Sequence, residues 1–231
     1  MRSPDDLFQD LESDRLQREA ELRLIENFAS RAEVEAERNM LLRSLVLLTY
    51  AHLEGFCKFA LLAYAGSVNA LAVPCREAAF PVLAASLGDI FAALRNPNSK
   101  APEFRSNLPD DGELHMLWRE RTFVESYEAI LCRSIEIPDR VIDTKANLNT
   151  VVLKRNLYQL GLDYPAVERH RGAIDRLLNV RNAIAHGDAL RVPSPEHMRE
   201  YTVAVFDVMQ FVQNGVFVAL RDGAFRRTHA A

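Results

Sequence analysis

Arg181 and His186 are the two residues whose types and spacing could carry out chemistry, and they lie on one predicted helix. They belong to the stretch IDRLLNVRNAIAHG, residues 174–187. Arg181 falls on a stripe of apolar residues at helical spacing, where a charge without a partner is unexpected. Asn182 and His186 are four residues apart on one face, and Gly187 is suited to end the helix. The helix therefore presents an arginine, an asparagine and a histidine near its C-terminal end.

These three residue types suit RNA cleavage without a metal. In that reaction the 2′-hydroxyl attacks the adjacent phosphorus, which requires a proton-transfer group and a fixed positive charge nearby. An imidazole can take or give a proton near neutral pH, which is the role predicted for His186. The guanidinium of Arg181 keeps its charge, and its forked donors match two phosphate oxygens. Asn182 is predicted to orient the phosphate or the imidazole.

A purely structural interpretation of these residues stays open. An arginine followed five residues later by a histidine is a weak signal by itself. His186 could interact with the last carbonyls of its helix, and Arg181 could form an ion pair that only stabilises the fold.

Two further sets of residues could support the site. Glu54 is a candidate ion-pair partner or orienting group for Arg181, but it could instead pair with Lys58 one helical turn away on an exposed strip. Basic residues in or just before the motif helix are candidates for contacts to the RNA backbone. They could equally be ordinary surface charge, because acidic residues are interleaved with them; they are Lys154, Arg155, Arg169, Arg171 and Arg176.

Length and composition indicate one domain, residues 1–231. The chain is 48% hydrophobic, which suffices for a core, and it has few Pro or Gly residues and no low-complexity linker. The net charge of −4 argues against a general polyanion binder, so contact with nucleic acid requires a local basic patch. The sequence lacks phosphate-binding loops, metal-ligand clusters and nucleophile elbows, so we expect no metal and no cofactor.

The cysteines and the apolar segments indicate the cellular compartment of the protein. Cys57, Cys75 and Cys132 are widely separated, which favours a reduced, cytoplasmic protein. The first residues show no signal peptide. Residues 41–64 are the nearest candidate for a membrane span, but charged residues interrupt them, so a buried core helix and no membrane contact are expected.

The hydrophobic periodicity predicts an all-α fold. Residues 1–32 form a charged N-terminal helix or arm, whose polar middle is expected to be solvated, and residues 33–222 form the helical core. Residues 96–112 are predicted to form a loop, and residues 140–143 are the only strand candidate. Core helices are expected at about 33–65, 81–94, 122–134, 148–160, 165–186 and from 195 onward.

Three segments together resemble the HEPN family. The Arg-polar-x-x-x-His pattern of residues 181–186 is similar to the HEPN signature, and residues 50–58 and 143–163 are similar to the MAE-like subgroup. The resemblance covers about residues 35–220. It implies a HEPN-like helical bundle, here with an additional N-terminal helix and a loop-rich middle insertion.

The resemblance also implies a function. Active members are metal-independent endoribonucleases, often toxins or phage-defence effectors, that dimerise so that two such helices meet across a cleft. Arg181, Asn182 and His186 match the signature positions. RNA and a second copy of the chain are the expected partners, and an antitoxin protein is a possible one. Some HEPN toxins carry a modifiable tyrosine two residues after the histidine, but this chain has Asp188 there.

Two alternatives to a nuclease stay open. One is a HEPN module that binds RNA or a nucleotide without cutting, and the other is a helical adaptor for protein association. Loss of RNA cleavage on replacing His186 separates the nuclease from both.

Overall fold

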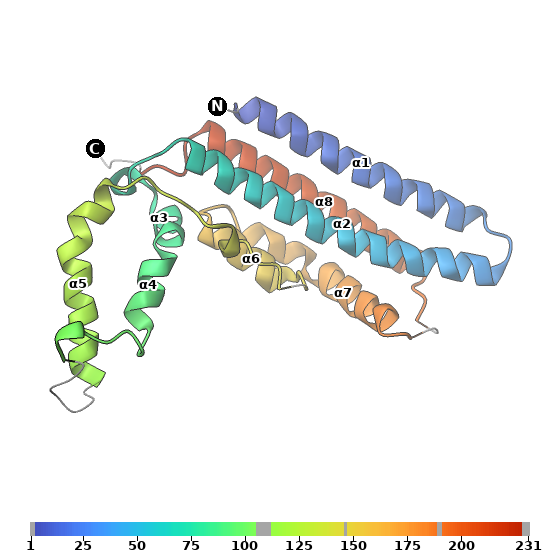
Figure 1. The fold of residues 1–231 in the computed structure, drawn as a ribbon. Helices are drawn as coiled ribbons and strands as arrows, with labels where there is room; N and C mark the ends of the chain where they lie inside the picture. Colours follow the sequence, from blue (N-terminus) through green and yellow to red (C-terminus); the bar gives the residue numbers. More distant parts are fainter. Residues whose placement is uncertain (1–2, 105–111, 146, 189–190, 228–231) are drawn as a thin grey trace.

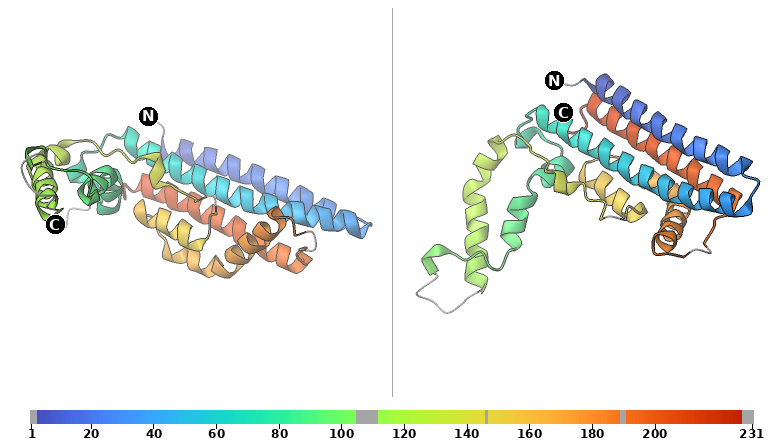
Figure 2. Two further views of the ribbon diagram at one scale, coloured as in Figure 1. Left: turned by 60° about the horizontal axis from the view of Figure 1, so that its bottom comes forward. Right: turned by 45° about the vertical axis from the view of Figure 1, so that its right-hand side comes forward.

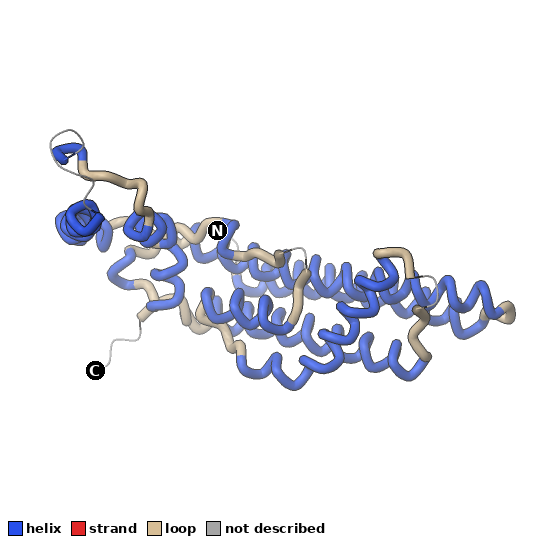
Figure 3. Tube along the Cα trace, turned by 90° about the horizontal axis from the view of Figure 1, so that it is seen from below, coloured by secondary structure: helices blue, strands red, loops and turns tan. Residues whose placement is uncertain are grey.

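The fold is helical throughout the described chain. The computed structural model describes residues 3–104, 112–145, 147–188 and 191–227. Those residues contain α-helices, short 3-10 turns and two isolated bridges, and no β-strand (Figures 1 and 3). The all-α prediction is confirmed, although part of the predicted loop at 96–112 lies outside the described residues.

Three long helices make the body of the molecule. α1 (Pro4–Arg31), α2 (Glu35–Ala70) and α8 (Pro195–Arg221) lie side by side (Figures 1 and 2). The Phe8 and Phe217 rings are 5.0 Å apart, and the Arg23 guanidinium lies over the Phe206 ring, so α1 runs antiparallel to α8. The buried apolar side chains of α2 and α8 form most of the core.

The N-terminal helix packs into this body, and the expectation of a solvated arm is wrong. Leu7, Leu11 and Leu22 are fully buried. The polar middle of α1 is also partly buried: the Arg15 Nε donates a hydrogen bond to the Gln213 side chain of α8 at 2.7 Å, and Arg15 pairs with Glu19. Polar residues interrupt the apolar pattern there because their partners lie across the helix interface, where pairing offsets desolvation.

Two shorter helices complete the core. α6 (Thr150–Gln159) and α7 (Arg171–Ala185) pack against one side of α2, and α7 also packs against α8. The predicted helix at 165–186 begins with a 3-10 turn, Pro165–His170, and becomes α-helical at Arg171. A bonding pattern typical of helix ends closes α7: the amides of Gly187 and Asp188 donate to the carbonyls of Ile184 and Ala183.

A second group of helices projects from one end of the body (Figure 1). It consists of α3 (Phe80–Ser86), α4 (Gly88–Arg95) and α5 (Gly112–Cys132). The predicted helix at 81–94 is divided at Leu87, and α5 begins ten residues before the predicted 122. The strand candidate at 140–143 is wrong: Asp139–Val141 is a 3-10 turn, since the described chain offers it no neighbouring strand to pair with.

Among the described residues, two helices are long and apolar enough by composition to cross a membrane, namely α2 and α8. In this fold 56% and 50% of their most apolar windows are buried against other helices. The core helices of a helical bundle have this composition, since they are covered on most sides.

Candidate functional site

Arg181 lies where α7 crosses α2, and three groups hold it. Its guanidinium carbon lies 3.9 Å from the centre of the Tyr50 ring. Its Nη1 donates a hydrogen bond to the Asn182 side-chain oxygen at 2.9 Å, and its Nη2 lies 3.9 Å from a carboxylate oxygen of Glu54. The aromatic face and the carboxylate both favour the positive charge. About one fifth of the Arg181 side chain is exposed, so the cation is fixed at the surface and not enclosed.

Tyr50 forms the floor of this site and was missed by the sequence analysis. Burial, together with the nearby Glu54 carboxylate, raises the pKa of Tyr50 to about 12, and Arg181 offsets part of this effect. The phenol is therefore neutral at pH 7. The backbone of Leu148 also interacts with the Tyr50 hydroxyl, which places the segment before α6 beside the site. The spacing of Tyr50 and Glu54, one turn apart on α2, is the signal that could have revealed this pair.

Asn182 and His186 occupy the exposed side of α7. The His186 amide donates to the Asn182 carbonyl at 3.0 Å, so His186 caps the helix with its backbone, while its imidazole is exposed. Positive φ at Gly187, +93°, turns the chain away immediately afterwards. The imidazole is thus open to solvent at a rigid helix end.

Within one protomer, Arg181 and His186 do not converge. Five residues separate them, which is about 140° around a helix and about 7.5 Å along it. Arg181 faces α2, whereas His186 faces solvent. One chain therefore supplies a fixed cation and one exposed imidazole as separate groups.

A family model describes nearly the whole chain. It is the model for RiboL-PSP-HEPN, and it matches residues 13–216. The chain belongs to the RiboL-PSP-HEPN family. Membership supports a nucleotide-binding or RNase-type module. The matched region begins inside α1, so most of that helix belongs to the HEPN domain. Comparison with curated proteins and with solved structures gave no match.

Glu54 and Lys58, the two residues predicted to support the site of this HEPN chain, lie in different surroundings. Glu54 faces Arg181 across the α2–α7 contact. Lys58 is exposed on α2, and no ion pair joins it to Glu54 among the described residues. The i,i+4 pair that the sequence left open is therefore absent, and Glu54 has the position expected of a partner for Arg181.

The predicted RNA-backbone residues lie away from His186, and most are already paired. Lys154 and Arg171 both contact the Glu168 carboxylate, at 2.7 and 3.0 Å. Arg176 pairs with Glu200. The remaining two have neutral partners: Arg155 donates to the Asp143 carbonyl and Arg169 to the His170 ring. Arg171 is the first residue of α7 and Arg169 lies in the turn before it, so a helix length of about 20 Å separates Arg171 from His186.

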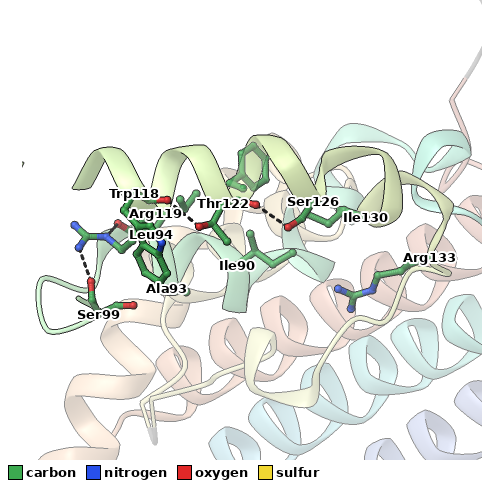
Figure 4. Close-up of a pocket in the computed structure, with 11 residues that line it drawn as sticks. Ile90, Ala93, Leu94, Ser99, Trp118, Arg119, Thr122, Ser126, Ile130 and Arg133 are labelled. Carbon is green, nitrogen blue, oxygen red and sulfur yellow. Dashed lines mark hydrogen bonds between the residues drawn. The ribbon is translucent and has the colours of Figure 1, made fainter. Parts of the chain in front are cut away.

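The α4–α5 hairpin contains a hollow of about 320 Å³ that is unrelated to these residues (Figure 4). Its polar side chains bond within the hairpin: Arg119 donates to the carbonyls of Leu94 and Ser99, and Thr122 and Ser126 donate to carbonyls of their own helix. The hollow thus offers mainly apolar surface. No group of three or more His, Cys, Asp or Glu residues in the described chain is arranged to hold a metal.

Proposed function

We propose that this protein is a metal-independent endoribonuclease of the HEPN type, acting as a toxin or defence effector. The arrangement of Arg181 carries the proposal. A stacking tyrosine, a carboxylate and an asparagine hold this guanidinium at the surface. A cation fixed in this way can meet the charge that gathers on a phosphate in the transition state without reorganising first.

His186 provides the proton transfer in this proposal. Its exposed imidazole at the end of α7 can reach a bound RNA strand without moving a helix. Cleavage by 2′-hydroxyl attack needs a base for that hydroxyl and an acid for the leaving 5′-oxygen. One protomer has one histidine at this position, so a symmetric dimer would supply both.

The surface beside the site suits such a dimer. An exposed strip of α2 borders the face that contacts α7, and it carries Met40, Leu47 and Ala51. Met40 is 59% exposed. Apolar side chains that stay exposed next to a polar site are typical of an interface. Pairing two copies here would bring both α7 ends, with Arg181 and His186, to one cleft.

The decisive experiment compares RNA cleavage by the purified wild-type protein and by His186→Ala. The variant should lose cleavage and keep wild-type helical circular dichroism, because the imidazole is exposed at the end of α7. Arg121→Ala, which removes an exposed side chain from α5, remote from α7, should stay active and is the matched control. Wild-type cleavage by His186→Ala would contradict the catalytic assignment.

The products test the chemistry. Cleavage should continue in excess EDTA and leave a 2′,3′-cyclic phosphate and a 5′-hydroxyl, since the attacking group is internal to the RNA. A substrate with 2′-deoxyribose at the cut position should be inert. The rate should pass through a maximum with pH, because one histidine must be protonated and the other not. Products with 5′-phosphates, or activity that magnesium restores after EDTA, would instead indicate a metal-dependent hydrolase.

A further inference from the structure

A hollow of about 440 Å³ lies on the flank of α7 that faces α8, between α7, residues 191–193 and the first turns of α8. Its described lining combines basic, polar and apolar groups and includes no carboxylate. The basic and polar lining residues are Arg176, Asn179, Arg191, His197 and Tyr201. Glu200 pairs with Arg176, so Arg191 is the lining arginine that is left for an anionic ligand.

One arginine of the hollow is open to a phosphate. Arg176 is already paired with Glu200. Arg191 is exposed, and no ion pair engages it in the described part of the chain. Guanidinium donors match phosphate oxygens in pairs. The hollow therefore offers Arg191 to a phosphate, beside the Arg176–Glu200 pair.

The rest of the lining suits a base more than a bare ion. Val180, Val192 and Pro193 give an apolar wall, while the Asn179 amide and the Tyr201 hydroxyl can bond to polar atoms. Burial raises the pKa of Tyr201, so its hydroxyl keeps its proton. Apolar walls with a few placed polar groups, in a volume of this size, are typical of small-ligand sites.

The hollow is connected to the candidate catalytic end of α7. Asn179, Asn182 and His186 recur at helical spacing on one side of α7, and all three are at least partly exposed. From Asn179 to His186 the distance along the helix is about 10 Å. A strand whose phosphate lies beside His186 can thus reach the hollow with a neighbouring nucleotide.

We propose that this hollow binds one nucleotide of the single-stranded RNA substrate, next to the nucleotide that is cut. Arg191 holds its phosphate beside the Arg176–Glu200 pair, and the base lies against Val192 and Pro193. This inference rests on the proposed nuclease function and names the part of the surface that receives the substrate. RNA recognition in single strands commonly combines such backbone cations with contacts to splayed bases.

The test measures RNA binding in the His186→Ala background, in which cleavage does not interfere. Fluorescence anisotropy with a labelled single-stranded 12-mer is recorded over a series of salt concentrations. Arg191→Ala should weaken binding about tenfold and reduce the slope of log affinity against log salt by about 0.7, the value for one lost contact to single-stranded phosphate. Asn179→Asp, which places a carboxylate at an exposed lining position, should weaken binding similarly.

Arg121→Ala is the matched control, since it removes an exposed arginine from α5, remote from α7. It should leave affinity and salt slope unchanged. Unchanged values for Arg191→Ala as well would overturn the nucleotide site, whether or not His186 is catalytic. Binding that depends on Arg191 in a protein that never cleaves RNA would support the site and contradict only the nuclease function.

Discussion

The contacts around the Arg181 guanidinium determine the role of this residue. Its guanidinium stacks on Tyr50 and neighbours Glu54, so the cost of placing a charge on an apolar helix face is offset by two favourable contacts. A guanidinium held this way cannot swing into solvent, and this fixed position makes it useful to a phosphate. The residue serves stability and the proposed chemistry together.

The Tyr50 ring should therefore matter for activity, and its hydroxyl should matter little. Tyr50→Leu removes the aromatic face and should lower kcat for RNA cleavage about fivefold, in line with a cation–π contact of roughly 1 kcal/mol. Tyr50→Phe keeps the ring and should stay within about twofold of wild type. Single-turnover cleavage, with circular dichroism to verify folding, measures both. Equal losses in the two variants would assign the effect to the hydroxyl.

At the scale of elements, the end of α7 fixes the position of His186. The turn after His186 depends on Gly187, whose φ of +93° is unfavourable for residues with a side chain. The amides of Gly187 and Asp188 close the last turn of the helix. Any change that unwinds this turn would displace the imidazole.

Gly187→Ala should destabilise the protein by about 1 kcal/mol, or about 2 to 4 °C in Tm for a chain of this size. The matched control is Gly66→Ala: Gly66 is exposed within α2, and an added Cβ meets nothing within 4 Å. That control should leave Tm unchanged or raise it, because alanine favours helix. Thermal unfolding followed by circular dichroism compares the two. A Tm for Gly187→Ala at or above that of the control would contradict this account of the helix end.

The contact between α1 and α2 contains a histidine that should make stability depend on pH. Burial lowers the pKa of His52; Arg18 lowers it further, and Glu21 and Asp14 oppose the shift. The His52 Nε2 lies 3.1 Å from Glu21, and its Nδ1 lies 3.3 Å from Arg18.

Because the folded pKa of His52 is below the ordinary value of about 6.5, the unfolded chain binds the proton first as pH falls. Stability should therefore be full above pH 6.5 and should decrease as pH falls toward the folded pKa. Tm measured between pH 7.5 and 5 should decrease more for wild type than for His52→Gln. The partly buried His170, whose pKa is also lowered, contributes equally to both proteins. Parallel curves for the two would rule out His52 as the source.

On the scale of the whole molecule, the position of the site at one surface decides what a single copy can do. Arg181 is directed toward α2 and His186 toward solvent, beside the apolar strip of α2. A second copy on this strip would cover exposed side chains and add a second histidine. Activity and association should therefore be linked.

Light scattering should give twice the chain mass of 26.1 kDa at micromolar concentration. Leu47→Glu, which places a charge on the exposed strip of α2, should produce monomers and abolish cleavage while leaving the fold intact. Val203→Glu, at an apolar position on α8 that is also exposed, is the control and should remain dimeric and active. A monomeric wild type that cuts RNA would contradict the paired-site mechanism.

The sequence by itself determined the helical fold and the residues of the motif, because both depend on local spacing. Periodic apolar residues predict α2, α7 and α8 well, and the motif at 181–186 needs only neighbours along one helix. Tertiary structure alone decided that α1 packs into the core, that Glu54 faces Arg181 and that Tyr50 lies beneath it. It also decided that Lys154, Arg171 and Arg176 have carboxylate partners. These contacts join residues that are far apart in the chain, and their energies depend on burial and distance, which no local pattern encodes.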